Sequence, residues 1–379
     1  MPLILTEEQE LLRDSVREFV RDHSPVAELR RLRDERDETG FSRPLWKQMA
    51  ELGWAGIPFP EEVGGADLGY AELGVVLEEL GRMLVATPFL STVVLGGGVV
   101  LRAGSESQRK DLLPGICSGD LILALAAEET PRFDPYRVAT RAEEVPDGYR
   151  LQGRKTFVLE GHVADSLIVL ARTSGAPGDR EGLTLLRVDP GAPGVTVTRQ
   201  VMVDSRNAST VELEGVHVDA SDRLGEVGRA ADVLDRVYDR ATAALSAEML
   251  GGIQEAFDRT LAYLRERKQF GVPIGSFQAL KHRAAQWFCE VELTRSVVMD
   301  ALRAIDEDRA DVPALVSACK ARASDTFILS GEEGVQMFGG IGMTDEEEIG
   351  FFLKRARAAE LTLGDSVYHR DRWARLEGY

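Results

Sequence analysis

Apolar residues in the first third of the chain recur at helical spacing. Thr6 followed by Gln9 fits a capping box, and the apolar positions from Leu12 to Val20 keep one face of a helix. The same period predicts further short helices, over residues 44–52, 70–84, 88–103 and 108–113. We therefore expect a helical N-terminal domain over residues 1–120.

The period changes at Leu121, where short and partly β-branched apolar runs begin to alternate with turn signals such as Pro146-Asp-Gly148. These runs cover residues 121–127, 166–171, 182–188, 195–203 and 210–218. They predict a small all-β domain, a sandwich or barrel, over residues 121–226. Helices followed by strands, with no βαβ alternation, argue against a doubly wound nucleotide-binding fold.

The helical period returns after Gly225 and continues to the end of the chain, which predicts a C-terminal four-helix bundle over residues 227–379. The predicted fold class is therefore α+β. Two of the long helices meet at a corner, residues 265–278, where Gly271 and Pro273 end the first helix and Ser276 is the expected N-cap of the second. Basic and amide side chains gather there, and taken alone they are typical of a solvated connection.

A second glycine-rich element, Gln336-Met-Phe-Gly-Gly-Ile-Gly342, lies between the helical segments 315–337 and 346–361. Clustered glycines let the backbone approach a ligand closely and leave N–H groups free to face a phosphate. They also form helix C-caps and turns.

Composition excludes several classes of function. The net charge of −18, from 63 acidic and 45 basic residues, argues against sequence-independent binding to nucleic acid or to an anionic membrane. Three cysteines without metal-ligand spacing suggest neither a disulfide framework nor a zinc site. No apolar run is long enough to span a bilayer, so we expect a soluble cytoplasmic protein without membrane insertion and without a metal centre.

In combination, the order of domains, the segment 267–282 and the segment 336–344 resemble the acyl-CoA dehydrogenase family. The resemblance covers nearly the whole chain, from the Leu5-Thr-Glu-Glu-Gln-Glu-Leu-Leu12 opening to the last helix. It implies an FAD-dependent α,β-desaturation of an acyl-CoA thioester, in which a carboxylate removes the α-proton and electrons leave through an electron-transfer flavoprotein. It also implies an oligomer, because the cofactor spans two subunits in this family.

The resemblance assigns cofactor contacts to both motifs. Arg267 would pair with the FAD pyrophosphate of a neighbouring subunit, a charge-assisted contact that lysine copies poorly. The other residues assigned to FAD in these motifs are Gln269, Phe270 and Gln278 of the corner, and Gln336, Gly339 and Gly340 of the glycine-rich element.

In the β domain, residues 125–129 match the family strand that touches the flavin, and residues 155–161 match the segment that covers its ring. Both depart from the usual pattern. Ala127 replaces a common threonine, and Phe157-Val-Leu159 stands where many members have Trp-Ile-Thr. The flavin contacts expected at Ala127, Phe157 and Leu159 are therefore less polar than usual.

Neither usual position of the catalytic base carries a carboxylate. The segment that often reads Tyr-Glu-Gly-Thr is Thr362-Leu-Gly-Asp365 here, so Leu363 takes the place of the glutamate, and the alternative position falls at Ala241.

Two substitutes for the base are Asp365, which could equally cap the last helix, and Glu248. Glu248 shares a polar helix face with Glu255 and Glu266, which favours a structural or interface role. His369 is expected to pack or to make polar contacts rather than to bind a metal.

Three functions remain open at this point. The first is a flavoprotein dehydrogenase of acyl-CoA, active alone as a homo-oligomer. The second is a noncatalytic subunit that completes the FAD site of a paralogous chain in a heterotetramer, as in members that act on bulky or steroid-derived CoA thioesters, which the absent base favours. The third is another flavin reaction on the same fold, such as an oxidase.

Overall fold

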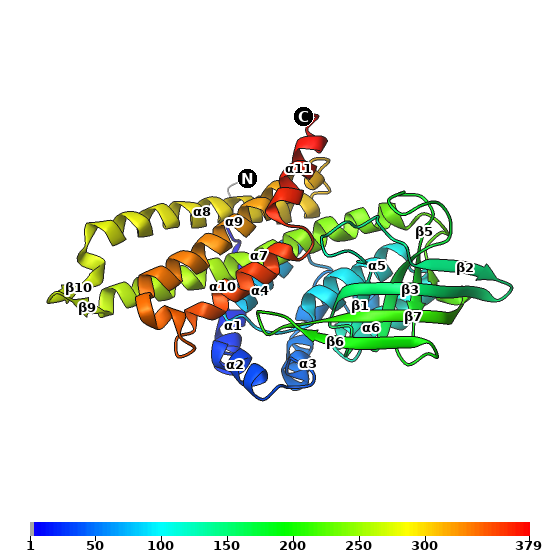
Figure 1. Ribbon diagram of the computed structural model, residues 1–379, viewed down its shortest axis with the longest axis horizontal. Coiled ribbons are helices and arrows are strands. Elements are labelled where there is room, and N and C mark those ends of the chain that lie inside the picture. The colour runs from blue at the N-terminus through cyan, green and yellow to red at the C-terminus, as the bar shows by residue number, and fades with distance from the viewer. Residues whose placement is uncertain (1–3) are drawn as a thin grey trace. The chain divides into compact units, whose positions relative to one another are not determined.

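The computed structural model describes residues 4–379, which divide into two compact units (Figure 1). One unit is helical and contains the residues up to 34, residues 70–85 and residues 242–379. The other contains residues 35–69 and 86–241 and holds the β-strands. The predicted order along the chain, helices, then strands, then helices, is confirmed.

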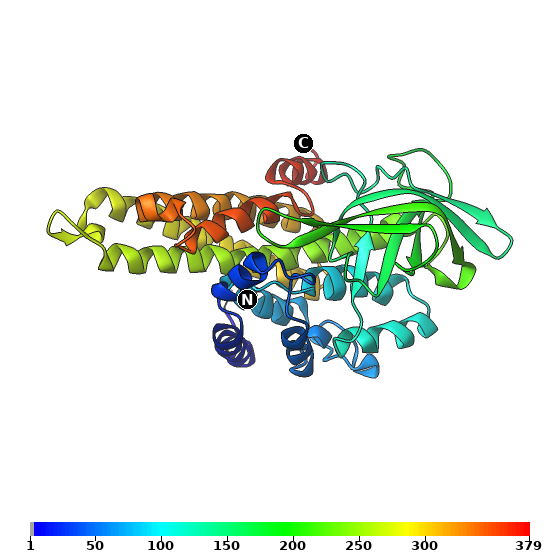
Figure 2. The same cartoon turned by 60° about the horizontal axis from the view of Figure 1, so that its bottom comes forward.

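Within the helical unit, α8, α9 and α10 run alongside the C-terminal part of the long helix α7 (Figures 1 and 2). Its helices are α1 (Glu7–His23), α2 (Val26–Asp34), α4 (Tyr70–Arg82), the part of α7 (Ala230–Glu266) from residue 242, α8 (Gln278–Asp306), α9 (Val312–Phe338), α10 (Ile349–Leu361) and α11 (Ser366–Leu376). The capping box predicted at Thr6 is confirmed, since its side chain accepts from the backbone N–H of Gln9.

Glycines allow α4 and α7 to pack with their backbones in close contact. A Cβ atom on Gly81 would lie 1.9 Å from the carbonyl oxygen of Glu248, and one on Gly251 would lie 1.8 Å from that of Glu78. Alanine is therefore excluded at both positions without movement of a helix, and the sequence of α7 around residue 248 is fixed by packing on more than one side.

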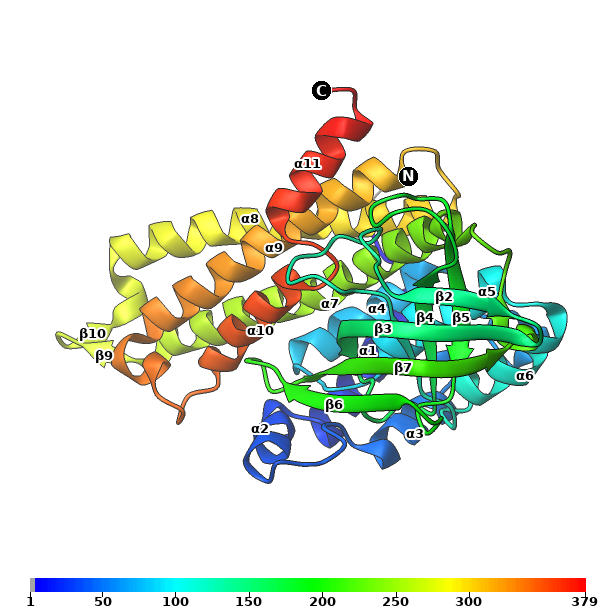
Figure 3. The ribbon, with the colours of Figure 1, turned by 45° about the vertical axis from the view of Figure 1, so that its right-hand side comes forward.

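The second unit is built on a sheet of order β6-β7-β3-β2-β4-β5-β8, to which β1 adds by parallel pairing with β4 (Figure 3). Its strands are β1 (Leu123–Ala126), β2 (Arg141–Val145), β3 (Gly148–Leu159), β4 (Ser166–Arg172), β5 (Leu183–Val188), β6 (Val195–Val201), β7 (Asn207–Asp219) and β8 (Arg223–Leu224). Helical segments of this unit are α3 (Arg43–Glu51), the π-helical η3 (Phe89–Gly96), α5 (Gly97–Ala103), α6 (Glu106–Cys117), the first turns of α7 and short 3-10 turns. The predicted β domain is confirmed.

The hairpin of β2 and β3 was not among the predicted strands, although its turn at residues 146–148 was recognised. Only part of each strand is buried, and the exposed positions carry charged residues such as Glu143 and Arg150. Because one face of this hairpin is solvated, apolar runs do not mark it.

The structure corrects the predicted start of α8. Ser276 is not its N-cap, because the helix begins at Gln278 and Phe277 occupies the cap position without a side-chain hydrogen bond. The hydroxyl of Ser276 instead donates to the carbonyl of Pro273 at 2.7 Å, inside a 3-10 turn. Among residues 4–379, no helix has both the length and the apolar character needed to span a membrane.

Candidate functional site

The corner between α7 and α8 ends in a small exposed hairpin, β9 (Lys268–Gln269) with β10 (Val272–Pro273). Its two turn residues, Phe270 and Gly271, have φ of 54° and 82°, the backbone that a tight two-residue turn requires. The Phe270 side chain is 91% exposed. A large aromatic side chain in this position contributes little to the stability of its own chain and is available to another molecule.

Polar side chains around this hairpin are also without a partner in the described chain. Arg267, Gln269 and Gln278 are exposed, and within the described chain their side chains make no hydrogen bond or ion pair. Other arginines of the helical unit are mostly paired, as Arg283 is with Glu333 at 2.8 Å. A free guanidinium and free amides on one rigid corner fit an anionic or polar ligand that this chain alone does not supply.

The glycine-rich element lies at the same end of the helical unit as the corner. The ring of Tyr263, one turn before Arg267, stacks on the ring of Phe338 with centroids 4.3 Å apart, and its hydroxyl donates to the Phe338 carbonyl at 3.3 Å. Phe338 ends α9 and follows the exposed Gln336 by two residues. Folding therefore brings together two motifs that are far apart in the sequence.

The three glycines of this turn have different requirements. A Cβ on Gly342 would lie 2.8 Å from atoms of Phe338 and Val335, so this chain's own packing requires a glycine there. Gly339 has φ of 70°, which favours glycine for backbone reasons, but a Cβ there or on Gly340 would meet nothing within 4 Å. Open space beside Gly339 and Gly340 allows a ligand to approach the backbone closely.

In the β domain, the predicted flavin-covering segment contains a β-bulge. The pairing register of β3 with β7 shifts between Lys155 and Val158, and Phe157 in the bulge has φ of 53°. Bulges and non-glycine residues with positive φ are concentrated at functional sites, where they redirect side chains. Phe157 and Leu159 are half-buried, whereas Ala127 is 5% exposed.

A buried ion pair fixes the strand ends beside this bulge. Lys155 is fully buried, and its ammonium donates to Glu129 Oε1 at 2.6 Å and to the carbonyl of Ala127 at 3.1 Å. Desolvation lowers the pKa of Lys155 to about 8, although the attraction of Glu129 raises it in part. Burial would raise the pKa of Glu129, but Lys155 and hydrogen bonds outweigh it and lower that pKa. The pair ties β3 to the segment that follows β1.

Glu128, the neighbour of Glu129, behaves differently. Its backbone carbonyl accepts from the N–H of Thr156 at 2.8 Å, but its half-buried carboxyl makes no hydrogen bond or ion pair with any described residue. Desolvation raises the pKa of Glu128 to about 8. Sequence reasoning missed this residue, because two adjacent glutamates give no signal of which one is paired.

The two candidate bases both hold structural positions. Glu248 is 8% exposed, and its Oε1 lies 3.0 Å from Nη2 of Arg355 on α10. Glu248 is buried against Arg355 of α10 instead of lying on a solvated face. Glu255, seven residues later on the same side of α7, pairs with Arg82 and Arg259. Asp365 accepts from the backbone N–H of Tyr368 at 2.8 Å and is the N-cap of α11.

Three comparisons with known proteins bear on this arrangement. The description of the acyl-CoA dehydrogenase N-terminal domain matches residues 6–120, that of the middle domain residues 124–216, and that of the C-terminal domain residues 232–376. The chain belongs to the acyl-CoA dehydrogenase family. Members of this family bind FAD, as do structural neighbours of this chain.

Similarity to individual acyl-CoA dehydrogenases extends over the whole chain. It is 32% identical to the mitochondrial isovaleryl-CoA dehydrogenase of Pongo abelii, in an alignment that covers 97% of this chain and 88% of that protein. The ChsE4-ChsE5 complex of Mycobacterium tuberculosis contains a chain with a TM-score of 0.90 and 29% identity, over 100% of both chains. A chain of the Tcur3481-Tcur3483 steroid ACAD has a TM-score of 0.86 and 30% sequence identity, over 98% of this chain and 98% of that chain.

The two positions at which a base is expected from the sequence carry buried hydrocarbon. Ala241 is fully buried in α7, and Leu363 is 3% exposed with φ of 59° in the turn between α10 and α11. Side chains from two helices hold this turn. The ammonium of the fully buried Lys320 donates to the carbonyls of Glu360 and Gly364, each at 2.9 Å.

His369 of α11 holds the same turn through the carbonyl of Leu363, 2.9 Å from its Nε2. Burial, with the nearby charge of Lys320, lowers the pKa of His369 to about 3, so the ring is neutral and Nε2 carries the proton. The prediction that His369 makes a polar contact is confirmed. Desolvation lowers the pKa of Lys320 to about 7. The contacts of Lys320 and His369 could not be predicted from the sequence, since both side chains bind backbone carbonyls, which every residue has.

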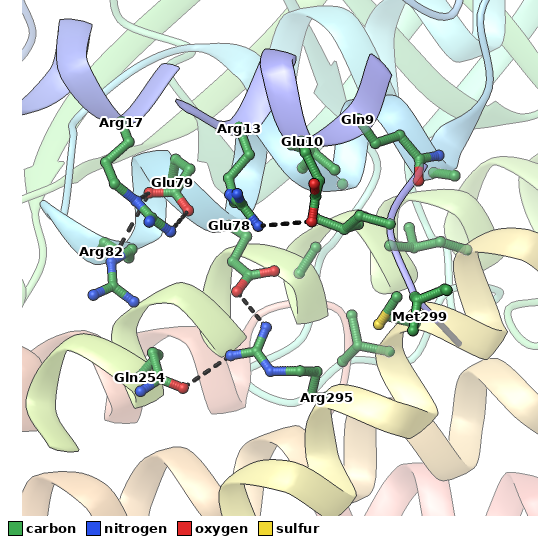
Figure 4. A pocket seen from close by; sticks show the side chains of 18 of the residues that line it. Gln9, Glu10, Arg13, Arg17, Glu78, Glu79, Arg82, Gln254, Arg295 and Met299 are labelled. Atoms are coloured by element: carbon green, nitrogen blue, oxygen red, sulfur yellow. Dashed lines mark hydrogen bonds and ion pairs between the residues drawn. The ribbon is translucent and has the colours of Figure 1, made fainter. Parts of the chain in front are cut away.

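The helical unit contains a cavity of about 520 Å³ (Figure 4). Its charged groups are satisfied by one another: Arg17 pairs with Glu79 at 2.7 Å, and Arg295 pairs with Glu78 at 2.6 Å. Its polar lining therefore offers few donors to a ligand, and none of the predicted site residues lines it. Among the described residues no cluster of His, Cys, Asp and Glu could hold a metal ion.

Proposed function

We propose that this chain is an FAD-binding subunit of an acyl-CoA dehydrogenase that desaturates an acyl-CoA thioester between Cα and Cβ. Its cofactor site is completed across a subunit boundary, and its electrons pass to an electron-transfer flavoprotein. The site residues are those assigned above: Arg267, Gln269, Phe270 and Gln278 of the corner, Gln336, Gly339 and Gly340 of the turn after α9, and Ala127, Phe157 and Leu159 of the β domain.

The observation that carries this proposal is the exposed corner between α7 and α8, which lies beside the turn that contains Gly339 and Gly340. Within the described chain the guanidinium of Arg267 makes no hydrogen bond or ion pair, and a Cβ on Gly340 would meet nothing within 4 Å. The ring of Phe270 is 91% exposed and touches the ring of Phe277 edge-on, with centroids 6.1 Å apart. A dinucleotide fits this set, because a pyrophosphate matches the guanidinium and flat rings match the phenyl group. An exposed corner of this kind serves a ligand held by a second subunit.

Each part of the chain then has a defined task. When bound, FAD supplies the two-electron oxidation. Arg267 neutralises the pyrophosphate charge, and the amides of Gln269 and Gln336 orient the cofactor. The bulge at Phe157 presents an apolar surface to the ring, while the pair of Lys155 and Glu129 holds the two segments that form it. The apolar surface excludes water from the reacting carbons.

Measurement of FAD retention tests the clamp. Arg267→Ala should weaken FAD binding about 10- to 100-fold, the value of one lost charge-assisted bidentate contact of about 1.5–3 kcal/mol. Arg265→Ala is the matched control, because Arg265 is also exposed and unpaired within the described chain, two residues earlier on α7. Full FAD occupancy in Arg267→Ala, or equal loss in both variants, would contradict the assigned role.

A second candidate function is that of a noncatalytic subunit that completes the FAD site of a paralogous chain. It is favoured by the hydrocarbon at Leu363 and Ala241 and by the structural engagement of Glu248 and Asp365. The similarity to a chain of the ChsE4-ChsE5 complex adds to this support. A steroid-type CoA thioester is then a substrate to test beside isovaleryl-CoA.

Anaerobic titration distinguishes the two functions. If the purified chain binds FAD and either acyl-CoA bleaches the flavin, the chain is an enzyme by itself. If bleaching requires co-expression with a paralogue that co-purifies with it, the subunit function holds and the self-sufficient enzyme is excluded.

A further inference from the structure

In the β-domain half of the site, the carboxyl group of Glu128 has no hydrogen-bond or ion-pair partner among residues 4–379. Glu128 and Glu129 are adjacent, yet Glu129 accepts from Lys155 and from the backbone N–H groups of Ala139 and Thr140, at 2.6, 2.6 and 3.0 Å. The Glu128 carboxyl accepts from none of these groups. A half-buried carboxyl without a partner is costly, and such groups are retained mainly where they serve a ligand.

The location of Glu128 is fixed by the backbone. Its carbonyl is held by the N–H of Thr156, the residue directly before the bulge at Phe157, and its N-terminal neighbour is Ala127. The carboxyl therefore belongs to the two segments to which we assign the flavin. The two glutamates differ in freedom: Glu129 is fixed by three donors, whereas Glu128 is free to face what binds there.

We propose that Glu128 is the ligand-facing carboxyl of this half-site, a neutral hydrogen-bond donor to an acceptor atom of the bound flavin or of the substrate's thioester carbonyl. This inference rests on the proposed function for the identity of the ligand. Both candidate acceptors are uncharged oxygen or nitrogen atoms, and a protonated carboxyl can donate to either whereas a carboxylate cannot.

The charges around Glu128 agree with a neutral group. Lys155 and Glu129 neutralise each other, and Arg172 interacts electrostatically with both. Glu160 of the covering segment is half-buried and adds no positive charge. No charge offsets the desolvation that raises the pKa of Glu128 to about 8. Near pH 7 the carboxyl is therefore mostly protonated and keeps its donor.

The test compares the wild type with Glu128→Gln, which stays neutral and keeps a donor at every pH, and with Glu128→Leu, which has none. Glu144→Gln is the control, since Glu144 is an exposed carboxylate in the same domain. Circular dichroism verifies the fold of each variant. FAD affinity is measured from pH 6 to 10, first with FAD alone and then with isovaleryl-CoA added to the FAD-loaded protein.

If the donor serves the flavin, FAD affinity of the wild type should fall about 10- to 100-fold between pH 7 and pH 10, because the binding-competent neutral form becomes rare. Glu128→Gln should lose less affinity than the wild type over this range, since Lys155 still titrates there but Glu128 does not. Glu128→Leu should bind weakly throughout, and Glu144→Gln should follow the wild type. If the donor serves the thioester, the same pattern should appear only in the acyl-CoA arm.

Identical pH profiles of the wild type and Glu128→Gln in both arms would overturn this inference while leaving the proposed function intact. Failure of the wild type to bind FAD, alone or with any co-purifying chain, would refute the proposed function and this inference with it.

Discussion

The ion pair between Glu248 and Arg355 gives the sharpest prediction, because it decides whether Glu248 is a base or a structural residue. The two side chains are 10% and 7% exposed, and Nη2 lies 3.0 Å from Oε1. Replacing Glu248 with Met removes a counter-charge from the buried guanidinium of Arg355. Replacing Arg355 with Met removes a counter-charge from the buried carboxylate of Glu248.

The magnitude follows from the distance. At 3.0 Å and an effective dielectric constant of about 20, the attraction is about 5–6 kcal/mol, from which several kcal/mol of desolvation must be subtracted. Removal of one partner of a buried pair costs about 3–5 kcal/mol, because the other charge is left behind. Each single variant should therefore lose about 3 kcal/mol or more, and the double variant Glu248→Met with Arg355→Met should lose less than the sum of the two.

The assay is thermal unfolding followed by circular dichroism at 222 nm. For a unit of this size we expect each single variant to melt about 6–12 °C below the wild type. Glu266→Gln is the control on the same helix, since Glu266 is exposed and unpaired within the described chain, and it should not shift the midpoint measurably. In parallel, any flavin reduction by substrate should survive in Glu248→Gln.

Three results would refute this reasoning. A shift below about 2 °C in both single variants would mean that the pair is not buried as described. Additive losses in the double variant would show that the two charges do not act on each other. Loss of flavin reduction in Glu248→Gln with an unchanged melting temperature would instead return Glu248 to the role of base.

Three further predictions concern the turn after α10 and the glycine-rich element. Between pH about 7 and pH 10.5 the unfolded wild type binds one more proton than the folded protein, because folding lowers the pKa of Lys320. The free energy of unfolding of the wild type should therefore rise with pH in this range, and Lys320→Met should lack that rise. A pH–stability curve parallel to that of the wild type would contradict it. Asp365→Ala should cost about 1 kcal/mol through the lost cap of α11, and Asp365→Asn should cost little. Equal melting temperatures in both variants would exclude the cap. Gly342→Ala should destabilise the chain by about 1–3 kcal/mol, whereas Gly340→Ala should fold normally and retain less FAD. Full FAD retention in Gly340→Ala would show that the open space there is not used.

Much of the fold could be predicted because its signals are local. The helical period before residue 120 and after residue 225, and the capping box at Thr6, depend on neighbours within a few residues. The solvated β2–β3 hairpin was missed for the same reason, since its strands become evident only when β3 pairs with β7 and β2 pairs with β4. Likewise, Ser276 has the chemistry of an N-cap, but its hydroxyl is used by the turn before α8.

The sequence by itself determined the order of the elements and the two motifs that resemble a flavin clamp, because residue type and spacing suffice for both. Only the tertiary structure decided which charged groups are free. Glu248 meets Arg355 across 107 residues of chain, Lys320 meets carbonyls of the turn after α10, and Glu128 differs from Glu129 only in what folding places beside it. The reason is physical: desolvation and the neighbours that folding brings decide whether a carboxyl or an amino group is charged, and both arise only when the chain folds.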